Sequence, residues 1–168
     1  MWFRMSRYPV RSESRSGWRA NGEAVSRVVV TGSFDDLRSR HVRFLEEASK
    51  MGDVHVLLWP DEAARSLEGG VKFSEAERFY MLQGIRYVSR VVLVTGQVER
   101  DALPQIEGSE PDVWVTNEAD DTLQKRTYCE SRGLAYRVVR NKDLQGFPLA
   151  RSVDPAGESA RKKVIVTG

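Results

Sequence analysis

The sequence predicts a three-layer α/β/α fold built on a mainly parallel sheet of five strands. From residue 27 onward, short β-branched runs alternate with amphipathic stretches, the pattern of a parallel sheet covered by helices. The chain has 168 residues, 40% of them hydrophobic and 30% charged, which suits one ordinary core. We therefore expect one domain, residues 27–160, with ligands beyond the carboxyl ends of the strands.

The expected strands are short runs rich in valine and leucine, bounded by polar residues or glycine. They are residues 27–31 (RVVVT), 54–58 (VHVLL), 91–95 (VVLVT), 113–116 (VWVT) and 136–139 (YRVV). An open sheet of this kind, alternating with helices, is Rossmann-like.

The first expected helix spans residues 39–51 and ends at Gly52. Its apolar positions recur at helical spacing and should face the core. They are Leu37, His41, Phe44, Leu45, Ala48 and Met51. A short helix over residues 61–67 follows the second strand.

Two further helices carry recognisable ends. Residues 74–87 open with Ser74 and Glu77, the spacing of a capping box. Residues 122–132 follow Asp121, a candidate N-cap, and precede Gly133, a candidate left-handed stop.

The charge is concentrated in a basic leader, residues 1–26, which we expect to be disordered. The formal net charge is +2, but residues 1–27 hold six arginines against two glutamates, so the remainder is close to neutral. A near-neutral folded part gives no electrostatic footprint for nucleic acid. The Arg- and Ser-rich composition is also shared by organellar transit peptides, although no helical apolar stripe is visible.

Cysteine and histidine are scarce. A single Cys129 cannot form an intrachain disulfide, and with only His41 and His55 there is no zinc-type cluster. Apolar runs fall short of the roughly 20 residues that span a bilayer. We expect no membrane partner, no metal site made of protein ligands alone, and a cytoplasmic location.

The C-terminal residues 163–168 (KVIVTG) nearly repeat residues 27–32 (RVVVTG). Residues 161–168 are therefore either the start of a second copy of the domain, cut short, or an extra edge strand that makes the sheet six-stranded. Both interpretations stay open.

The segment 31–41 (TGSFDDLRSRH) holds the richest chemistry. A buried strand turns here through Gly32 into a helix, so that backbone N–H groups and the positive helix end form an anion site. A triphosphate would suit it.

These residues resemble the loop GxFDxxHxGH of the cytidylyltransferase-like nucleotidyltransferase superfamily, at Gly32, Phe34, Asp35 and His41. Further segments resemble the family in the same order. They are residues 76–82 (AERFYML), 85–88 (IRYV), 114–118 (WVTNE) and 148–154 (PLARSVD).

The resemblance, as to glycerol-3-phosphate and ethanolamine-phosphate cytidylyltransferases, implies an activity. A nucleoside monophosphate would pass from CTP or ATP to a phosphorylated small molecule, releasing pyrophosphate, with Mg²⁺ accompanying the nucleotide. It implies catalytic roles for His41, Arg38 and Lys72. It implies nucleotide binding by Gly32, Ser33, Phe34, Asp35, Arg40, Arg78, Asn117, Arg140 and Ser152.

Three positions depart from the family pattern: Arg38 replaces a histidine, Arg40 replaces the glycine, and Val153 stands where a hydroxyl is expected. The alternative hypothesis is a non-catalytic nucleotide-binding or structural domain of a tandem protein, whose partner would be the second copy or a homodimer mate.

Blander roles also stay open for individual residues. His41 could be a hydrogen-bonded core histidine, Arg78 could pair with Glu75 or Glu77, and Lys72 could be a solvated loop lysine.

Overall fold

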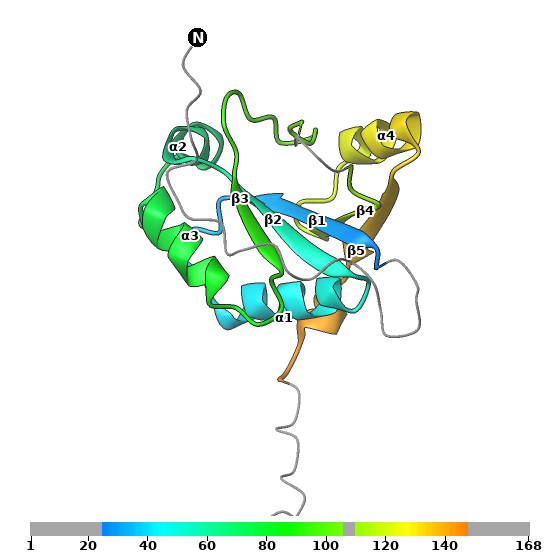
Figure 1. Cartoon of the computed structure of the whole chain (residues 1–168), viewed down its shortest axis with the longest axis horizontal. Helices are drawn as coiled ribbons and strands as arrows, with labels where there is room; N and C mark the ends of the chain where they lie inside the picture. Colours follow the sequence, from blue (N-terminus) through cyan, green and yellow to red (C-terminus); the bar gives the residue numbers. More distant parts are fainter. Residues whose placement is uncertain (1–24, 106–109, 148–168) are drawn as a thin grey trace, which may run out of the picture.

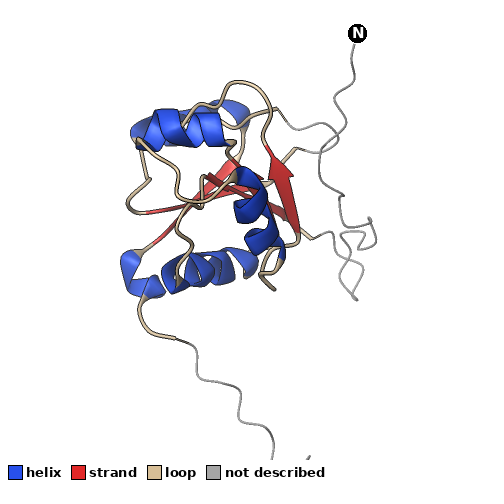
Figure 2. Ribbon diagram, turned by 90° about the vertical axis from the view of Figure 1, so that its left-hand side faces the viewer, coloured by secondary structure: helices blue, strands red, loops and turns tan. Residues whose placement is uncertain are grey.

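The computed structural model describes residues 25–105 and 110–147. In this part of the chain, five strands form one sheet in the order β3-β2-β1-β4-β5, and every neighbouring pair is parallel. Helices lie on both sides of the sheet (Figures 1 and 2). The expected three-layer, Rossmann-like fold is confirmed. The predicted leader up to residue 24, Ser152 and residues 161–168 lie outside the described residues.

All five predicted strands are present. They are β1 Arg27–Gly32, β2 Asp53–Leu58, β3 Arg90–Leu93, β4 Val113–Asn117 and β5 Ala135–Val139. Only the third shifts noticeably, because it begins at Arg90 and ends at Leu93, two residues before the predicted Thr95.

The helices are α1 Ser39–Ser49, α2 Asp61–Glu68, α3 Glu75–Gln83 and α4 Leu123–Arg132, followed by a 3₁₀ turn, η1 Asn141–Leu144. α3 is shorter than predicted, since Gly84 caps it and its N–H bonds back to Met81 at 3.1 Å. The predicted N-cap of α4 was wrong: the Thr122 hydroxyl, not Asp121, accepts the Lys125 N–H at 3.2 Å.

Alternate residues of each strand feed two separate cores. On one face, Val28 and Val30 of β1 pack with side chains of α1, α3 and η1, among them Phe44, Phe79 and Leu144. On the other face the core consists of Val29, Leu57, Val94, Trp114 and Cys129, with Tyr128 and Tyr136 against it.

α1 ends at Ser49 with Lys50 as its C-cap, so the predicted end at Gly52 was wrong; Gly52 instead lets the turn before β2 approach the chain before β1. A Cβ on Gly52 would lie 2.0 Å from the Ser26 carbonyl oxygen, which also accepts the Asp53 N–H at 2.9 Å. Only glycine fits there.

The strand order indicates where a ligand site should lie. The chain runs outward from β1 through β2 to β3, then returns to β4 on the other side of β1. The carboxyl ends of β1 and β4 therefore flank the topological switch point, where ligands bind in open α/β sheets.

Candidate functional site

A cavity of about 330 Å³ lies at this switch point. Its walls come from the end of β1, the β1–α1 loop, the start of α1, the end of β4 with the loop after it, α2 and η1. The lining residues include seven of the predicted site residues: Gly32, Ser33, Phe34, Asp35, Arg40, His41 and Asn117. The structure thus gathers most of the predicted site around one cavity.

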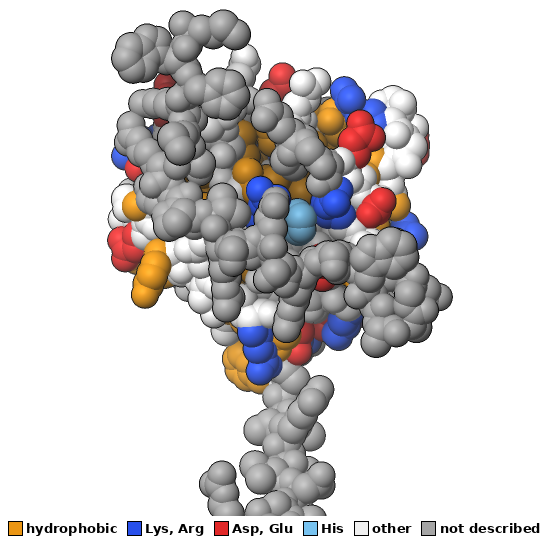
Figure 3. Space-filling model, in the orientation of Figure 1, with side chains coloured by type: hydrophobic (Ala, Val, Ile, Leu, Met, Phe, Trp, Pro, Cys, Tyr) orange, Lys and Arg blue, Asp and Glu red, His pale blue; other side chains and the backbone are white. Residues whose placement is uncertain are grey.

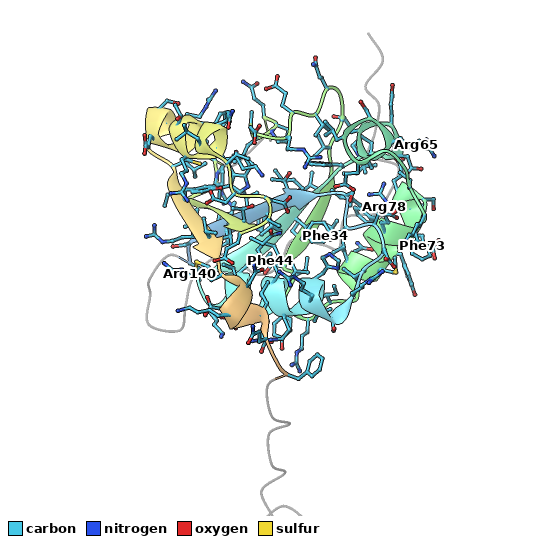
Figure 4. All side chains as sticks on the ribbon, turned by 180° about the vertical axis from the view of Figure 1, so that it is seen from behind. Phe34, Phe44, Arg65, Phe73, Arg78 and Arg140 are labelled. Carbon is cyan, nitrogen blue, oxygen red and sulfur yellow. The ribbon has the colours of Figure 1, made fainter. Side chains whose placement is uncertain are left out.

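The β1–α1 loop, residues 33–38, owes its shape to two residues in the left-handed region. Phe34 has φ 49° and Asp36 has φ 57°, which are unusual for residues other than glycine. The Phe34 ring meets the His41 ring edge to face, with centroids 6.4 Å apart. Figure 4 labels Phe34 beside α1, with Phe44 nearby. The loop therefore turns sharply and brings His41 to the cavity wall.

His41 is fixed by the backbone of the residue before its helix. The Arg38 N–H donates to His41 Nδ1 at 2.9 Å, so the histidine takes the N3 place that glutamate or glutamine fills in a capping box. With Nδ1 accepting, the proton of the neutral ring sits on Nε2. Burial, and then the charge of Arg38, lowers the pKa of His41, which favours this neutral form. The arrangement leaves Nε2 as the donor available to a ligand.

Asp35 ties the loop before α3 to this site. Its two carboxylate oxygens accept the backbone N–H groups of Lys72 at 2.7 Å and of Phe73 at 2.9 Å. Asp35 therefore positions Lys72 across a span of 37 residues.

The other two predicted catalytic residues, Lys72 and Arg38, both bind the carboxylate of Asp36 and are not among the residues that line the cavity. Lys72 Nζ lies 2.8 Å from Asp36 Oδ2, and the Arg38 guanidinium binds the same oxygen. Hydrogen bonds from Lys72 and from Arg38 lower the pKa of Asp36. Both cations are exposed, at 62% and 70% of their side-chain surface. A phosphate would have to compete with Asp36 for them.

Arg78, a predicted nucleotide-binding residue, is not among the residues that line the cavity and is 0% exposed. Its guanidinium donates to the backbone carbonyls of Ser33, Trp59 and Phe73, and pairs with Asp61 at 2.7 Å. The carboxylate that pairs with Arg78 is that of Asp61 on α2, and not Glu75 or Glu77, the alternative to phosphate binding that the sequence left open. In this structure Arg78 joins the β1–α1 loop to α2 and α3.

Arg40 lines the cavity, but its guanidinium reaches the Asn141 side chain of η1. Arg140 is exposed at the end of β5, on the side of the molecule opposite Arg78 (Figure 4). Asn117 shapes the loop after β4, since its Oδ1 accepts the N–H groups of Ala119 at 2.8 Å and Asp120 at 3.0 Å.

Two lining or bridging residues were missed by the sequence interpretation: Glu68 accepts the buried Ser33 hydroxyl at 2.6 Å, and Asn141 holds Arg40. Each belongs to a polar helix end or turn of ordinary composition, so no local signal could have singled it out. Asp120, which accepts from Asn117 Nδ2 at 2.8 Å, belongs to the polar segment 117–121, whose residues suggest either a magnesium site or an ordinary loop before a helix.

Magnesium is implied by the family resemblance, and the cavity suits it only as a companion of phosphate. Among the described residues, no group of three or more His, Cys, Asp or Glu could hold a metal ion. Glu68 and Asp120 each offer a single carboxylate to the cavity. Mg²⁺ is usually held by one or two carboxylates together with substrate phosphates, and these residues fit that pattern.

The visible described parts of one face carry mixed charge. Figure 3 shows Lys and Arg side chains interspersed with Asp and Glu on this face. No helix in residues 25–105 and 110–147 is long and apolar enough to cross a membrane.

Several known proteins are similar to this chain in sequence. FAD synthase of Aciduliprofundum boonei is 34% identical over 128 residues, covering 71% of this chain and 84% of that protein. FAD synthase of Pyrococcus abyssi is 36% identical over 119 residues, covering 68% and 78%. The bifunctional protein HldE of Koribacter versatilis is 38% identical over 101 residues, which cover 58% of this chain and 20% of that protein.

A solved structure has the same fold. The lipopolysaccharide core biosynthesis protein of Thermoplasma volcanium superposes with a TM-score of 0.52 at 23% identity, covering 70% of this chain and 96% of that one. The profile of the cytidylyltransferase-like family matches residues 29–147, from within β1 to just past η1. The chain therefore belongs to the cytidylyltransferase-like nucleotidyltransferase family.

Proposed function

We propose that this protein transfers a nucleoside monophosphate from ATP or CTP to a phosphorylated small molecule and releases pyrophosphate. The observation that carries the proposal is His41: its Nδ1 is held by the Arg38 amide, which leaves Nε2 as a donor on the wall of the switch-point cavity.

The relatives suggest which substrates to test first. Several are FAD synthases, and FAD consists of an adenylyl group joined to flavin mononucleotide through a pyrophosphate linkage. ATP and flavin mononucleotide are therefore the first pair, with CTP and phosphorylated alcohols and sugars as the wider panel. Nucleotide substrates and a lone buried thiol at Cys129 both suit a cytoplasmic location.

The chemistry needs little beyond positioning and charge stabilisation. An oxygen of the acceptor phosphate forms a bond to the α-phosphorus, while the bond from that phosphorus to the bridging oxygen breaks. Pyrophosphate leaves with the electron pair. His41 Nε2 and the first amides of α1 would donate to the phosphate oxygens as charge shifts to the leaving group.

Other residues would support this step. Gly32 carries no side chain into the cavity, so nucleotide can lie against the backbone. Magnesium, when bound with the nucleotide, would neutralise phosphate charge, with Glu68 and Asp120 as its candidate protein ligands.

A second function is favoured by one observation. Arg40 stands at the family's glycine position and its side chain follows the cavity wall to Asn141, narrowing the space for nucleotide. A nucleotide-binding domain without transfer activity, paired with a second copy or another chain, would tolerate this.

The test is pyrophosphate release by the full chain, with MgATP or MgCTP and each acceptor. We expect release with at least one pair, and a fall in kcat of about 100-fold in His41→Ala. The matched control is His55→Ala, on β2, which should keep the wild-type rate. Nucleotide binding without pyrophosphate release from any pair would establish the second function instead.

A further inference from the structure

Arg40 bridges three elements around the cavity. Its guanidinium donates to the side-chain oxygen of Asn141 on η1, and the Asn141 N–H donates to the Glu118 carboxylate at 2.9 Å. Glu118 follows β4, so the bridge joins α1, η1 and the β4–α4 loop. Of the three bridge residues, Arg40 is the one that lines the cavity.

The partner of Arg40 differs in kind from those of the other arginines nearby. Arg38 binds the Asp36 carboxylate, Arg78 binds the Asp61 carboxylate, and Arg43 of α1 binds the carboxylates of its own helix. Arg40 binds a neutral amide, and the contact is exposed to solvent. A guanidinium bound to a neutral amide lacks the attraction between opposite charges that an ion pair adds, so Arg40 is, of these four arginines, the one most easily redirected to phosphate.

The long side chain of Arg40 makes such a move feasible. It starts on the first turn of α1, one residue before His41, whose pKa its charge helps to lower. A guanidinium has a planar fork of donors that matches phosphate oxygens. Rotation of side-chain torsions alone would carry the group from Asn141 into the cavity.

We propose that the contact between Arg40 and Asn141 is a latch, which opens when a nucleoside triphosphate enters and Arg40 transfers from the amide to the phosphates. The inference rests on the proposed function, because the ligand is the same triphosphate. It assigns Arg40 a positive role in place of the obstruction that its size suggests. It also predicts that loss of the contact to Asn141 raises the affinity for a nucleoside triphosphate more than for a monophosphate, because Arg40 then binds a ligand of greater negative charge.

The test measures binding of MgATP and of AMP by titration calorimetry at low salt, with MgCTP as a second triphosphate. Asn141→Ala removes the latch but keeps the guanidinium. We expect it to tighten MgATP binding by about threefold to tenfold, the worth of one hydrogen bond, and AMP binding by less. Arg40→Ala removes the phosphate donor and should weaken MgATP binding. In the double variant the gain from Asn141→Ala should vanish.

Matched controls separate this from a general effect on the fold. Gln145→Ala deletes an exposed amide just after η1, and Arg90→Ala deletes an exposed arginine at the amino end of the sheet. Neither should change MgATP affinity. Urea unfolding of every variant verifies that the protein used in the titrations is folded.

The outcomes distinguish failure of the latch alone from failure of the proposed function. If wild type binds MgATP but Asn141→Ala binds it equally or more weakly, the latch is overturned and the proposed function stands. If Arg40→Ala binds MgATP more tightly than wild type, Arg40 is only an obstruction, and the latch is again overturned. If neither wild type nor any variant binds MgATP or MgCTP, both the proposed function and the latch fail.

Discussion

The two loops that line the cavity are held in opposite ways. The β1–α1 loop is held from a distance: Ser33 binds Glu68, Asp35 binds Lys72 and Phe73, and Arg78 binds the Ser33 carbonyl, across 35 to 45 residues. The β4–α4 loop is held mostly by its own neighbours, because Asn117 and Lys125 bind its backbone across two to five residues, while Glu118 accepts from the distant Asn141.

This difference predicts which substitutions should disturb each wall of the cavity. The β1–α1 wall depends on α2 and α3, so changes far along the chain should reach it. The β4–α4 wall is held mainly by local bonds, so changes within it should matter most, together with changes at the Asn141 bond to Glu118. Four predictions, ordered from the largest expected effect to the smallest, test this contrast.

The largest effect should come from Arg78→Met, which keeps the apolar stem of the side chain and removes the guanidinium. The Asp61 carboxylate and three backbone carbonyls would lose their donor inside the protein. We expect the free energy of unfolding, measured in urea, to fall by about 3 to 5 kcal/mol.

The matched control is Arg65→Ala, since Arg65 also pairs with Asp61, at 3.7 Å, but is 62% exposed. That change should cost less than about 1 kcal/mol. Equal losses of unfolding free energy in the two variants would show that the buried contacts of Arg78 stabilise the protein no more than the exposed contact of Arg65.

Next in size is Asp35→Asn, which breaks the link to the loop before α3. Both carboxylate oxygens accept a backbone N–H, and an amide would place its NH₂ against one of these donors. We expect a loss of about 2 kcal/mol in the free energy of unfolding, with faster hydrogen exchange at the amides of Lys72 and Phe73. Asp36→Asn, whose partners are exposed side chains, should leave that exchange unchanged.

The same contrast between local and long-range contacts explains how much of the site the sequence could predict. The strands, the helices and the left-handed Gly133 were predictable because each depends on local composition and spacing. Ser74 likewise caps α3, its hydroxyl accepting the Glu77 N–H. The family resemblance then identified the cavity residues that belong to a local sequence motif, such as His41.

What escaped prediction is the set of long-range partners. Asp36 holds Lys72, Asp61 holds Arg78, and Asn141 holds Arg40, each pair separated by 17 to 101 residues. Nothing in the composition near either member marks its partner, because an exposed acid or amide is compatible with many folds. The packing of segments far apart in the chain decides which polar side chains meet, and for Arg40 and Asn141 it depends on the sheet order, which returns β4 and β5 to the other side of β1.

A smaller and strictly local effect is expected for Asn117→Ala. The change removes the amide that accepts from Ala119 and Asp120, so the β4–α4 loop should lose about 1 kcal/mol of stability. Hydrogen exchange should rise at residues 119 and 120 but not at Lys72 or Phe73. Gln124→Ala, an exposed amide on α4, serves as the control. Faster exchange at Lys72 in Asn117→Ala would mean that the two walls are coupled after all.

The smallest effect concerns pH and His41, which lies where the two walls meet. Burial, followed by the charge of Arg38, lowers its pKa below the ordinary value of 6.5. The unfolded chain therefore takes up the proton first, and the contribution of His41 to stability is full above 6.5 and is lost as pH falls through the lowered pKa. A proton on Nδ1 would also face the Arg38 N–H, so the helix cap would break.

His41→Gln keeps an acceptor at the cap position but does not titrate. The free energy of unfolding, measured from about pH 7.5 to about pH 5, should therefore fall less steeply in this variant than in wild type. Burial also lowers the pKa of His55, so His55→Gln should remove a separate share of the slope. Because His55 lies on β2, away from both walls, only His41→Gln should also remove the pH dependence of hydrogen exchange at Arg38. A slope in His41→Gln equal to that of wild type would place the acid sensitivity elsewhere and leave the cap intact at low pH.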